Sequence, residues 1–237
     1  GVSHEKISEL FMDKLNHEFN GALNLAITIF KNEYPKKFLH QLVSSQLDID
    51  RLDYLKRDCF FAGVMEGTIG VDRIISMLTV YNDQLVVEEK GILSIENFLN
   101  ARRLMYWQVY LHKTTVSAER MMVNIIRRAE HLVKSGEGLP ASESLLTFLR
   151  HTYSLDNFKD KAEVLNAYGL LDDNDIWGAI KLWRSHPDFI LATLCKLLTE
   201  RRLFQIRLGS ESIRKEEIER IREKVTQTFG ILRSESS

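Results

Sequence analysis

Residues 44–58 mix side chains that could bind a metal ion and a phosphate ester: Ser-Ser-Gln-Leu-Asp-Ile-Asp-Arg-Leu-Asp-Tyr-Leu-Lys-Arg-Asp. At 100° per residue on a helix, the apolar residues face one way. The acids, guanidinium groups and phenol crowd the other side: Asp50, Arg51, Asp53, Tyr54, Arg57 and Asp58. Carboxylates suit hard divalent cations and planar guanidinium groups suit polyphosphates. A solvated face carrying ion pairs gives the same pattern, so spacing alone does not decide between the two interpretations.

A second stretch, residues 98–113, places Arg102, Tyr106 and Tyr110 at i, i+4 and i+8. These three side chains share one helix face. For Tyr106 and Trp107, an aromatic stripe facing the core is an equally good interpretation. The remaining histidines share no spacing typical of metal ligands. These are His17, His40, His131, His151 and His186.

The 44–58 stretch, followed by Ala62-Gly63-Val64, resembles the signature of HD-superfamily dNTP triphosphohydrolases. That family includes the bacterial dGTPase-like enzymes and the SAM-and-HD-domain dNTPase. The resemblance implies that Asp50 is the last ligand of a catalytic metal ion and that Arg51 contacts the triphosphate. It also implies that Tyr54 and Asp58 hold the deoxyribose.

Two further matches extend the resemblance. The family places a triphosphate-binding Arg and a sugar-packing Tyr eight residues apart, which Arg102 and Tyr110 match. His4-Glu5 resembles the family's His-Glu pair, in which the His helps position or protonate the scissile phosphate oxygen. His4 and Asp50 are therefore the candidate catalytic residues.

The family binds its metal through a His, a His-Asp dipeptide and a distant Asp, and this chain contains no His-Asp dipeptide. In relatives that dipeptide lies just upstream of the His-Glu pair, so we expect the sequence to be a truncated form of a complete enzyme. The alternative is a short protein that has lost its metal site and acts as a binding or regulatory subunit. Because one carboxylate cannot hold a catalytic divalent ion, we expect the chain alone to bind no metal and to be inactive.

The resemblance implies that the complete enzyme hydrolyses a dNTP, such as dGTP, to deoxynucleoside and inorganic triphosphate. It implies a divalent ion (Mg, Mn, Fe, Ni or Zn) and a homo-oligomer, either a dimer or a tetramer. A second enzymatic hypothesis is an HD phosphohydrolase that acts on another phosphoester. A helical interaction module that self-associates through residues 94–135 is the non-enzymatic alternative.

Long apolar-periodic runs and only 3 Pro predict an all-α, HD-domain-like helical bundle. The helices are expected at about 5–20, 23–30, 36–45, 48–63, 94–135 (with an interruption near 114–115), 142–151, 159–168, 173–184, 187–201 and 211–225. Two β-rich runs flanking Asn82-Asp83 predict a hairpin at about 78–87. Alternating residues predict a short strand near 203–208. We expect residues 1–135 to form the C-terminal part of a catalytic domain and 136–237 a truncated helical accessory region.

The composition limits the kinds of partner that this chain is expected to bind. With 32 Lys and Arg against 33 Asp and Glu, the net charge of −1 provides no general positive field for nucleic acid. Cys59 and Cys195 each lie in an apolar setting, which predicts buried thiols in a reducing compartment. No apolar run reaches the roughly 18 residues of a membrane span, and the start does not read as a signal peptide. A cytoplasmic protein with no membrane partner is expected.

Overall fold

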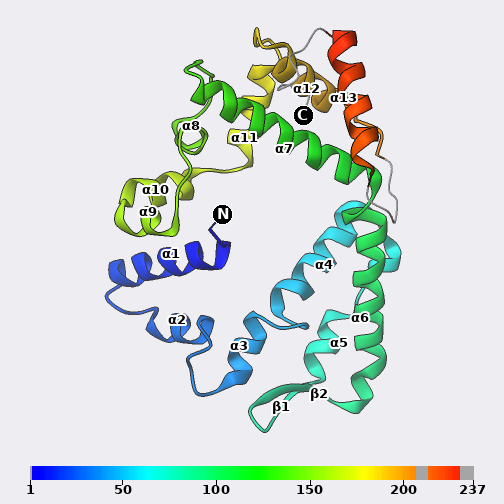
Figure 1. Ribbon diagram of the computed structural model, residues 1–237. Helices are drawn as coiled ribbons and strands as arrows, with labels where there is room; N and C mark the ends of the chain where they lie inside the picture. Colours follow the sequence, from blue (N-terminus) through cyan, green and yellow to red (C-terminus); the bar gives the residue numbers. More distant parts are fainter. Residues whose placement is uncertain (1, 207–212, 230–237) are drawn as a thin grey trace. The chain divides into compact units, whose positions relative to one another are not determined.

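The computed structural model describes residues 2–206 and 213–229, in which the regular structure is helical apart from one two-stranded hairpin (Figure 1). The architecture confirms the predicted all-α, HD-like fold with a small hairpin. The α-helices are α1 (His4–Glu18), α2 (Asn24–Phe30), α3 (Lys37–Val43), α4 (Ile49–Ala62), α5 (Val71–Ser76), α6 (Ile92–Met105), α7 (Lys113–Lys134), α8 (Glu143–Arg150), α9 (Leu155–Asp160), α10 (Ala162–Leu170), α11 (Asp173–Trp183), α12 (Phe189–Thr199) and α13 (Lys215–Phe229). The 3₁₀ turns η1 (Met65–Gly67) and η2 (Glu89–Gly91) and the π-helix η3 (Tyr106–Tyr110) join them.

Contacts between residues divide the chain into two units, Gly1–Phe204 and Gln205–Ser237. The first unit contains α1 to α12 and the hairpin, and the second contains α13. The division into a catalytic region, 1–135, and an accessory region, 136–237, stays a prediction.

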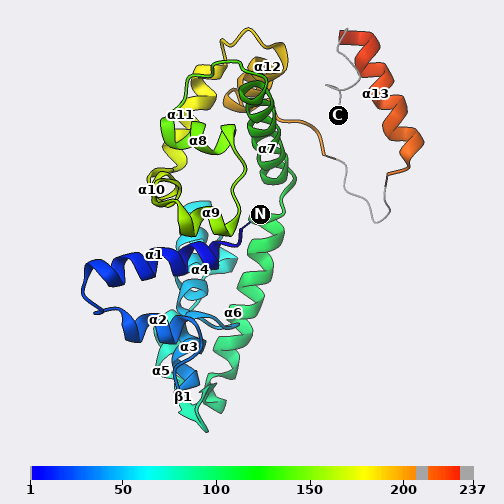
Figure 2. The same cartoon turned by 60° about the vertical axis from the view of Figure 1, so that its left-hand side comes forward.

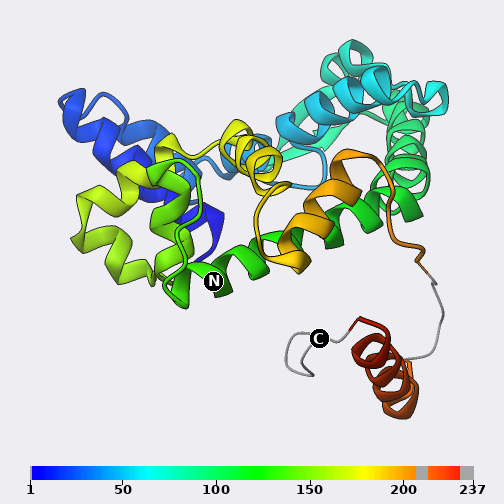
Figure 3. The same cartoon turned by 90° about the horizontal axis from the view of Figure 1, so that it is seen from above.

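The largest apolar core of the first unit lies between α7, α8, α11 and α12. Helices α7 and α12 pack side by side (Figures 1 and 3). Trp183 is fully buried in this core, and its indole Nε1 donates a hydrogen bond to the carbonyl oxygen of Pro140 at 3.0 Å. The indole thus fills the core while its one polar group is satisfied.

A second core holds α4 against α6 through a set of buried apolar side chains. These are Leu52, Leu55, Cys59, Val64, Ile69, Ile74, Phe98, Ala101 and Met105. Gly67 sits where a Cβ would come within 2.1 Å of Cys59 Sγ, so only glycine permits this close approach. The backbone of η1 can therefore pack directly on both helices and fix their separation.

The hairpin forms where it was predicted, with β1 (Leu78–Tyr81) antiparallel to β2 (Gln84–Val87). Asn82 and Asp83 both have positive φ, as the turn requires. Gln41 of α3 accepts a hydrogen bond from the Leu85 N–H at 2.7 Å, which ties the hairpin to that helix. Figure 2 shows α3 and β1 at the same end of the first unit.

The predicted helix 94–135 is divided into α6, η3 and α7. The break falls at Leu111 and His112, earlier than expected, because the His112 ring accepts the Thr114 N–H and caps α7. The predicted helix 159–168 corresponds to α10, and a separate short helix, α9, precedes it because Ser154 starts a capping box there. The short helix α5 was not predicted.

The strand predicted near 203–208 is wrong where the structure describes it, because residues 203–206 lie in no strand. The Phe204 carbonyl instead accepts a hydrogen bond from Ser117 Oγ at 2.6 Å, which ties this segment to α7. Residues 207–208 lie outside the described residues, as do 211–212 of the predicted C-terminal helix.

Both cysteines are free and buried, as predicted. Burial raises the pKa of the Cys195 thiol to about 12. Among the described residues, no helix has both the length and the apolar character needed to cross a membrane.

Candidate active site

The first turn of α4 is organised by Asp48, whose side chain is almost entirely removed from solvent. Its carboxylate accepts hydrogen bonds from the backbone N–H groups of Arg51 at 2.8 Å and Ser45 at 3.2 Å. It also forms an ion pair with the Arg51 guanidinium. Arg51 is therefore held at the helix N-terminus by both its backbone and its side chain.

Tyr54, one turn further along α4, is half-buried and lies within reach of the charges of both candidate phosphate-binding arginines. Burial raises the pKa of its phenol, while the positive charges of Arg102 and Arg51 and a hydrogen bond with Arg102 oppose that rise. Both guanidinium groups thus lie close enough to one phenol to influence it, although they come from different helices.

Asp58 faces Tyr110 across the gap between α4 and η3. The Tyr110 hydroxyl donates a hydrogen bond to Asp58 Oδ2 at 2.5 Å. Burial, this hydrogen bond and the Asp58 charge raise the pKa of Tyr110 well above its usual value. Tyr110 therefore keeps its proton and remains the hydrogen-bond donor to Asp58. The Tyr110 ring also lies 6.4 Å from that of Tyr54, edge to face.

Arg102 is held by a residue that the sequence interpretation did not single out. Its Nη1 donates a hydrogen bond to Gln46 Oε1 at 3.2 Å, and its guanidinium lies 5.9 Å from the centre of the Tyr106 ring. Gln46 and Asp48 both belong to the 44–58 motif. Their place in that motif is the one feature of the sequence that could have indicated a role in the site.

The π-helix η3 carries the aromatic residues of this site. Tyr106 and Tyr110 have ring centres 5.2 Å apart, and π turns are frequent at functional sites. Tyr106 and Trp107 are exposed, so the aromatic stripe does not face the core. Arg103 instead covers the Trp107 ring at 4.3 Å.

The structure thus brings together five predicted site residues, which we call the arginine–tyrosine cluster: Arg51, Tyr54, Asp58, Arg102 and Tyr110. His4 is exposed and pairs with the adjacent Glu5 at 3.3 Å. Asp50 is exposed and makes no side-chain hydrogen bond or ion pair with any residue in 2–206 or 213–229. Neither His4 nor Asp50 is linked to the cluster by such a contact.

The residues described do not form a complete metal site. Within the described ranges, no three His, Cys, Asp or Glu side chains lie close enough to hold an ion. Asp50 alone does not meet the requirement of a divalent ion for several ligands.

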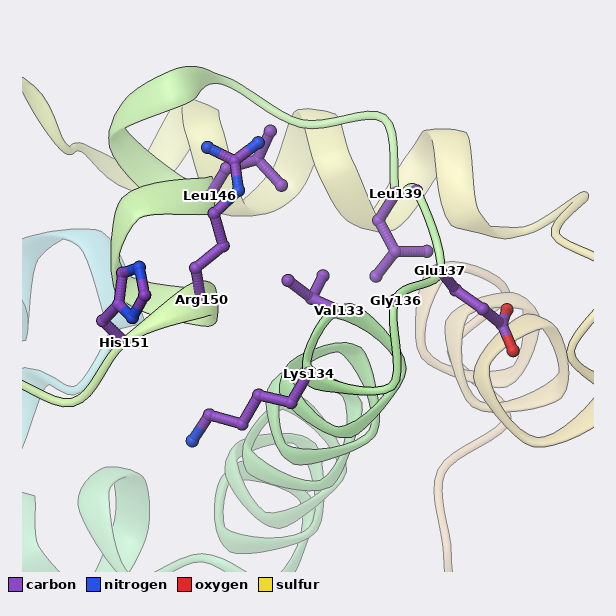
Figure 4. A pocket seen from close by; sticks show the side chains of 9 residues that line it. Val133, Lys134, Gly136, Glu137, Leu139, Leu146, Arg150 and His151 are labelled. Atoms are coloured by element: carbon purple, nitrogen blue, oxygen red, sulfur yellow. The ribbon is translucent and has the colours of Figure 1, made fainter.

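Away from the cluster, a cavity of about 510 Å³ lies between the end of α7 and α8 (Figure 4). Lys134, Arg150 and His151 line it, with apolar Leu139 and Leu146. Lys134 pairs with Glu130 and Arg150 pairs with Glu143. Because α7 and α8 both end here, their partial negative charges also disfavour a bound anion.

Residues 69–147 match the family model described as the HD associated region. The chain is similar to the crystal structure of a phosphohydrolase from Bacteroides thetaiotaomicron, with a TM-score of 0.95 and 52% sequence identity. The match covers 100% of this chain and 59% of that one.

Among curated relatives, the chain is 36% identical over 177 residues to the uncharacterized protein YwfO of Bacillus subtilis, covering 75% of this chain and 39% of that protein. It is 25% identical over 107 residues to the deoxynucleoside triphosphate triphosphohydrolase SAMHD1 homolog of Dictyostelium discoideum. That match covers 44% of this chain and 21% of that protein. The chain thus spans well under two thirds of the length of these relatives. The chain is thus similar to an HD associated region and to phosphohydrolases over part of their length.

Proposed function

We propose that the complete protein carrying this chain is a phosphohydrolase that converts a dNTP to deoxynucleoside and inorganic triphosphate. The observation that carries the proposal is the arginine–tyrosine cluster. The charges of two guanidinium groups reach the Tyr54 phenol, and the Tyr54 ring lies 6.4 Å from that of Tyr110, which is hydrogen-bonded to Asp58. Likeness to the Bacteroides phosphohydrolase and, more distantly, to the Dictyostelium triphosphohydrolase supports it.

The cluster has groups that could bind both the polyphosphate and the sugar of a nucleotide. Arg51 and Arg102 would neutralise the polyphosphate, since guanidinium groups bind phosphate oxygens in a fork. Each charge-assisted contact of this kind contributes roughly 1.5–3 kcal/mol.

The sugar would lie on the tyrosine side of the cluster. Asp58 is an acceptor, so it would bind a sugar hydroxyl, with Tyr54 beside it. Tyr110 would pack against the ring of the deoxyribose. His4 as the acid and Asp50 as a metal ligand remain part of the proposal through the family resemblance.

HD phosphohydrolases are generally metal-dependent, and a bound divalent ion would polarise the phosphate and activate water. Asp50 would supply one carboxylate, and the other ligands would come from outside the described residues. Homo-oligomerisation and a cytoplasmic location also belong to the proposal.

The test uses the complete protein, incubated with each dNTP in Mg²⁺ or Mn²⁺, with released triphosphate separated by ion-exchange chromatography. Triphosphate and deoxynucleoside are expected in equal amounts. Release of orthophosphate or pyrophosphate instead, or activity limited to another phosphoester, would contradict the proposal. Binding of dNTP without any hydrolysis would favour a regulatory subunit.

A matched pair of variants ties the activity to the cluster. Asp58→Asn is expected to reduce kcat/KM strongly because it removes the charge that accepts the sugar hydroxyl. Asp53→Asn on the same helix, whose side chain is exposed and pairs with Arg57, is expected to leave kcat/KM unchanged. Equal effects of the two substitutions would argue against a sugar site at Asp58.

A further inference from the structure

Asp48 does more than a helix cap requires. An N-cap needs one acceptor oxygen, and Asn or Ser provides it as well as Asp does. Burying a carboxylate is unfavourable unless it is paired and hydrogen-bonded. Asp48 is nevertheless only 2% exposed, and it satisfies this requirement through two backbone N–H groups and the Arg51 guanidinium. Its charge therefore serves Arg51 rather than the cap alone.

Other capping aspartates of the chain show the difference. Asp172 caps α11 through the N–H groups of Asn174 and Asp175 and remains exposed. Asp188 caps α12 and holds Arg128 of α7, with both side chains largely buried, so that pair ties two helices together. Arg51 lies on the helix that Asp48 caps, and it keeps 30% of its side chain exposed. The Asp48–Arg51 pair thus joins no two helices and leaves guanidinium N–H groups available to a ligand.

The segment before α4 also fixes the second arginine. Gln46 accepts from Arg102, while the Leu47 N–H bonds to Ser45 Oγ at 3.2 Å and the Ser45 N–H bonds to Asp48. Residues 45–48 are therefore hydrogen-bonded to one another within the segment. The acceptors for both arginines therefore lie two residues apart on one internally hydrogen-bonded segment.

We propose that Asp48 and Gln46 are positioning residues that orient Arg51 and Arg102 toward a bound polyphosphate. The inference rests on the proposed function, because it assigns the polyphosphate to these two arginines. Holding the guanidinium groups in place before binding reduces the side-chain entropy that is lost when the ligand arrives.

The experiment measures binding of inorganic triphosphate and of a deoxynucleoside to the complete protein by titration calorimetry. Asp48→Asn keeps the cap and removes the charge that holds Arg51. Its affinity for triphosphate is expected to fall roughly tenfold, the effect of weakening one charge-assisted hydrogen bond, while the affinity for deoxynucleoside stays unchanged. Asp172→Asn is the matched control and should alter neither affinity.

Gln46→Ala tests the same idea at an exposed residue, where the substitution leaves the core intact. A several-fold loss of triphosphate affinity is expected, again without loss of deoxynucleoside affinity. The positioning role of Asp48 and Gln46 is contradicted if both variants bind triphosphate as tightly as the wild type. It is also contradicted if both variants lose affinity for triphosphate and deoxynucleoside equally.

These outcomes separate the two proposals. A wild-type protein that hydrolyses dNTPs, with variants that bind triphosphate normally, overturns positioning and leaves the function intact. A wild-type protein that hydrolyses no dNTP, with variants selectively weakened for triphosphate, supports positioning and overturns the function.

Discussion

The two main cores of the first unit use polar side chains in different ways. In the α7–α12 core, the Arg128–Asp188 pair is largely buried and joins two helices. At the edge of the α4–α6 core, half-buried polar side chains contact one another, as Tyr110 and Asp58 do. A buried ion pair is costly to break because one charge is then left without its partner, whereas a connected set of polar groups at the edge of a core can bind a ligand. The comparison therefore predicts that substitutions in the first region change stability and those in the second change binding.

The largest effect is expected from Trp183→Ala in the α7–α12 core. Removing this fully buried indole leaves a large cavity and should lower the free energy of unfolding by about 4 kcal/mol. Urea denaturation measures the loss. Trp177 on the same helix is 41% exposed, so Trp177→Ala is the control and should cost much less. Similar losses for both would refute the assignment of the core.

The next largest effect concerns Asp188→Ala, which leaves Arg128 without its carboxylate partner. Breaking such a largely buried pair should cost about 3 kcal/mol near pH 7. Burial raises the pKa of Asp188, but the Arg128 and Leu191 hydrogen bonds and nearby positive charges outweigh it, so the pKa is lowered.

The sign of the pH dependence follows from that lowered pKa. The contribution of Asp188 is fully present above its ordinary pKa of 3.8 and is lost as the pH falls through the lower folded value. Urea denaturation at several pH values should show the wild type and Asp188→Ala converging in acid. A difference in stability that grows toward low pH would contradict the ion-pair interpretation.

In the α4–α6 region, Arg102→Ala should act on the substrate rather than on stability. Loss of one charge-assisted phosphate contact should remove about 2 kcal/mol of transition-state stabilisation, which corresponds to a roughly 30-fold lower kcat/KM for a dNTP. Arg103→Ala is the neighbouring control, since Arg103 covers the exposed Trp107 ring. Steady-state kinetics on the complete protein decide the point, and equal losses for both arginines would remove Arg102 from the site.

The smallest effect is expected from Tyr110→Phe, which deletes only the hydroxyl that donates to Asp58. A loss of about 1 kcal/mol in deoxynucleoside affinity should follow, because Asp58 is oriented less well. Tyr81→Phe on the exposed hairpin serves as the control. Stronger deoxynucleoside binding by Tyr110→Phe would mean that the hydroxyl competes with the ligand.

Much of the fold could be predicted because local signals match it. The hairpin follows from its turn pair, and α4 follows from a capping Asp48 and an αL Gly63 at its end. The helix α5 is a six-residue segment too short to show a period. No side-chain pattern distinguished the π turn at 106–110 from an α-helix.

The site was harder to predict. The residues of the cluster came from a family resemblance, and their meeting depends on the packing of α4 against α6, which Gly67 permits. The burial of Asp48 is a property of that packing, so the motif contained the residue without revealing its role. The positions of His4 and Asp50 in an active site stay predictions.

The π-helix at Tyr106–Tyr110 makes the length of this segment critical. A π turn holds more residues than an α turn, so deleting one residue would restore ordinary helical winding. The widened turn absorbs its extra residue locally, whereas a residue deleted from the regular turns of α6 would not be absorbed, and every later side chain would rotate by about 100° around the axis. Tyr110 would then swing away from Asp58 even though neither residue of the pair had changed.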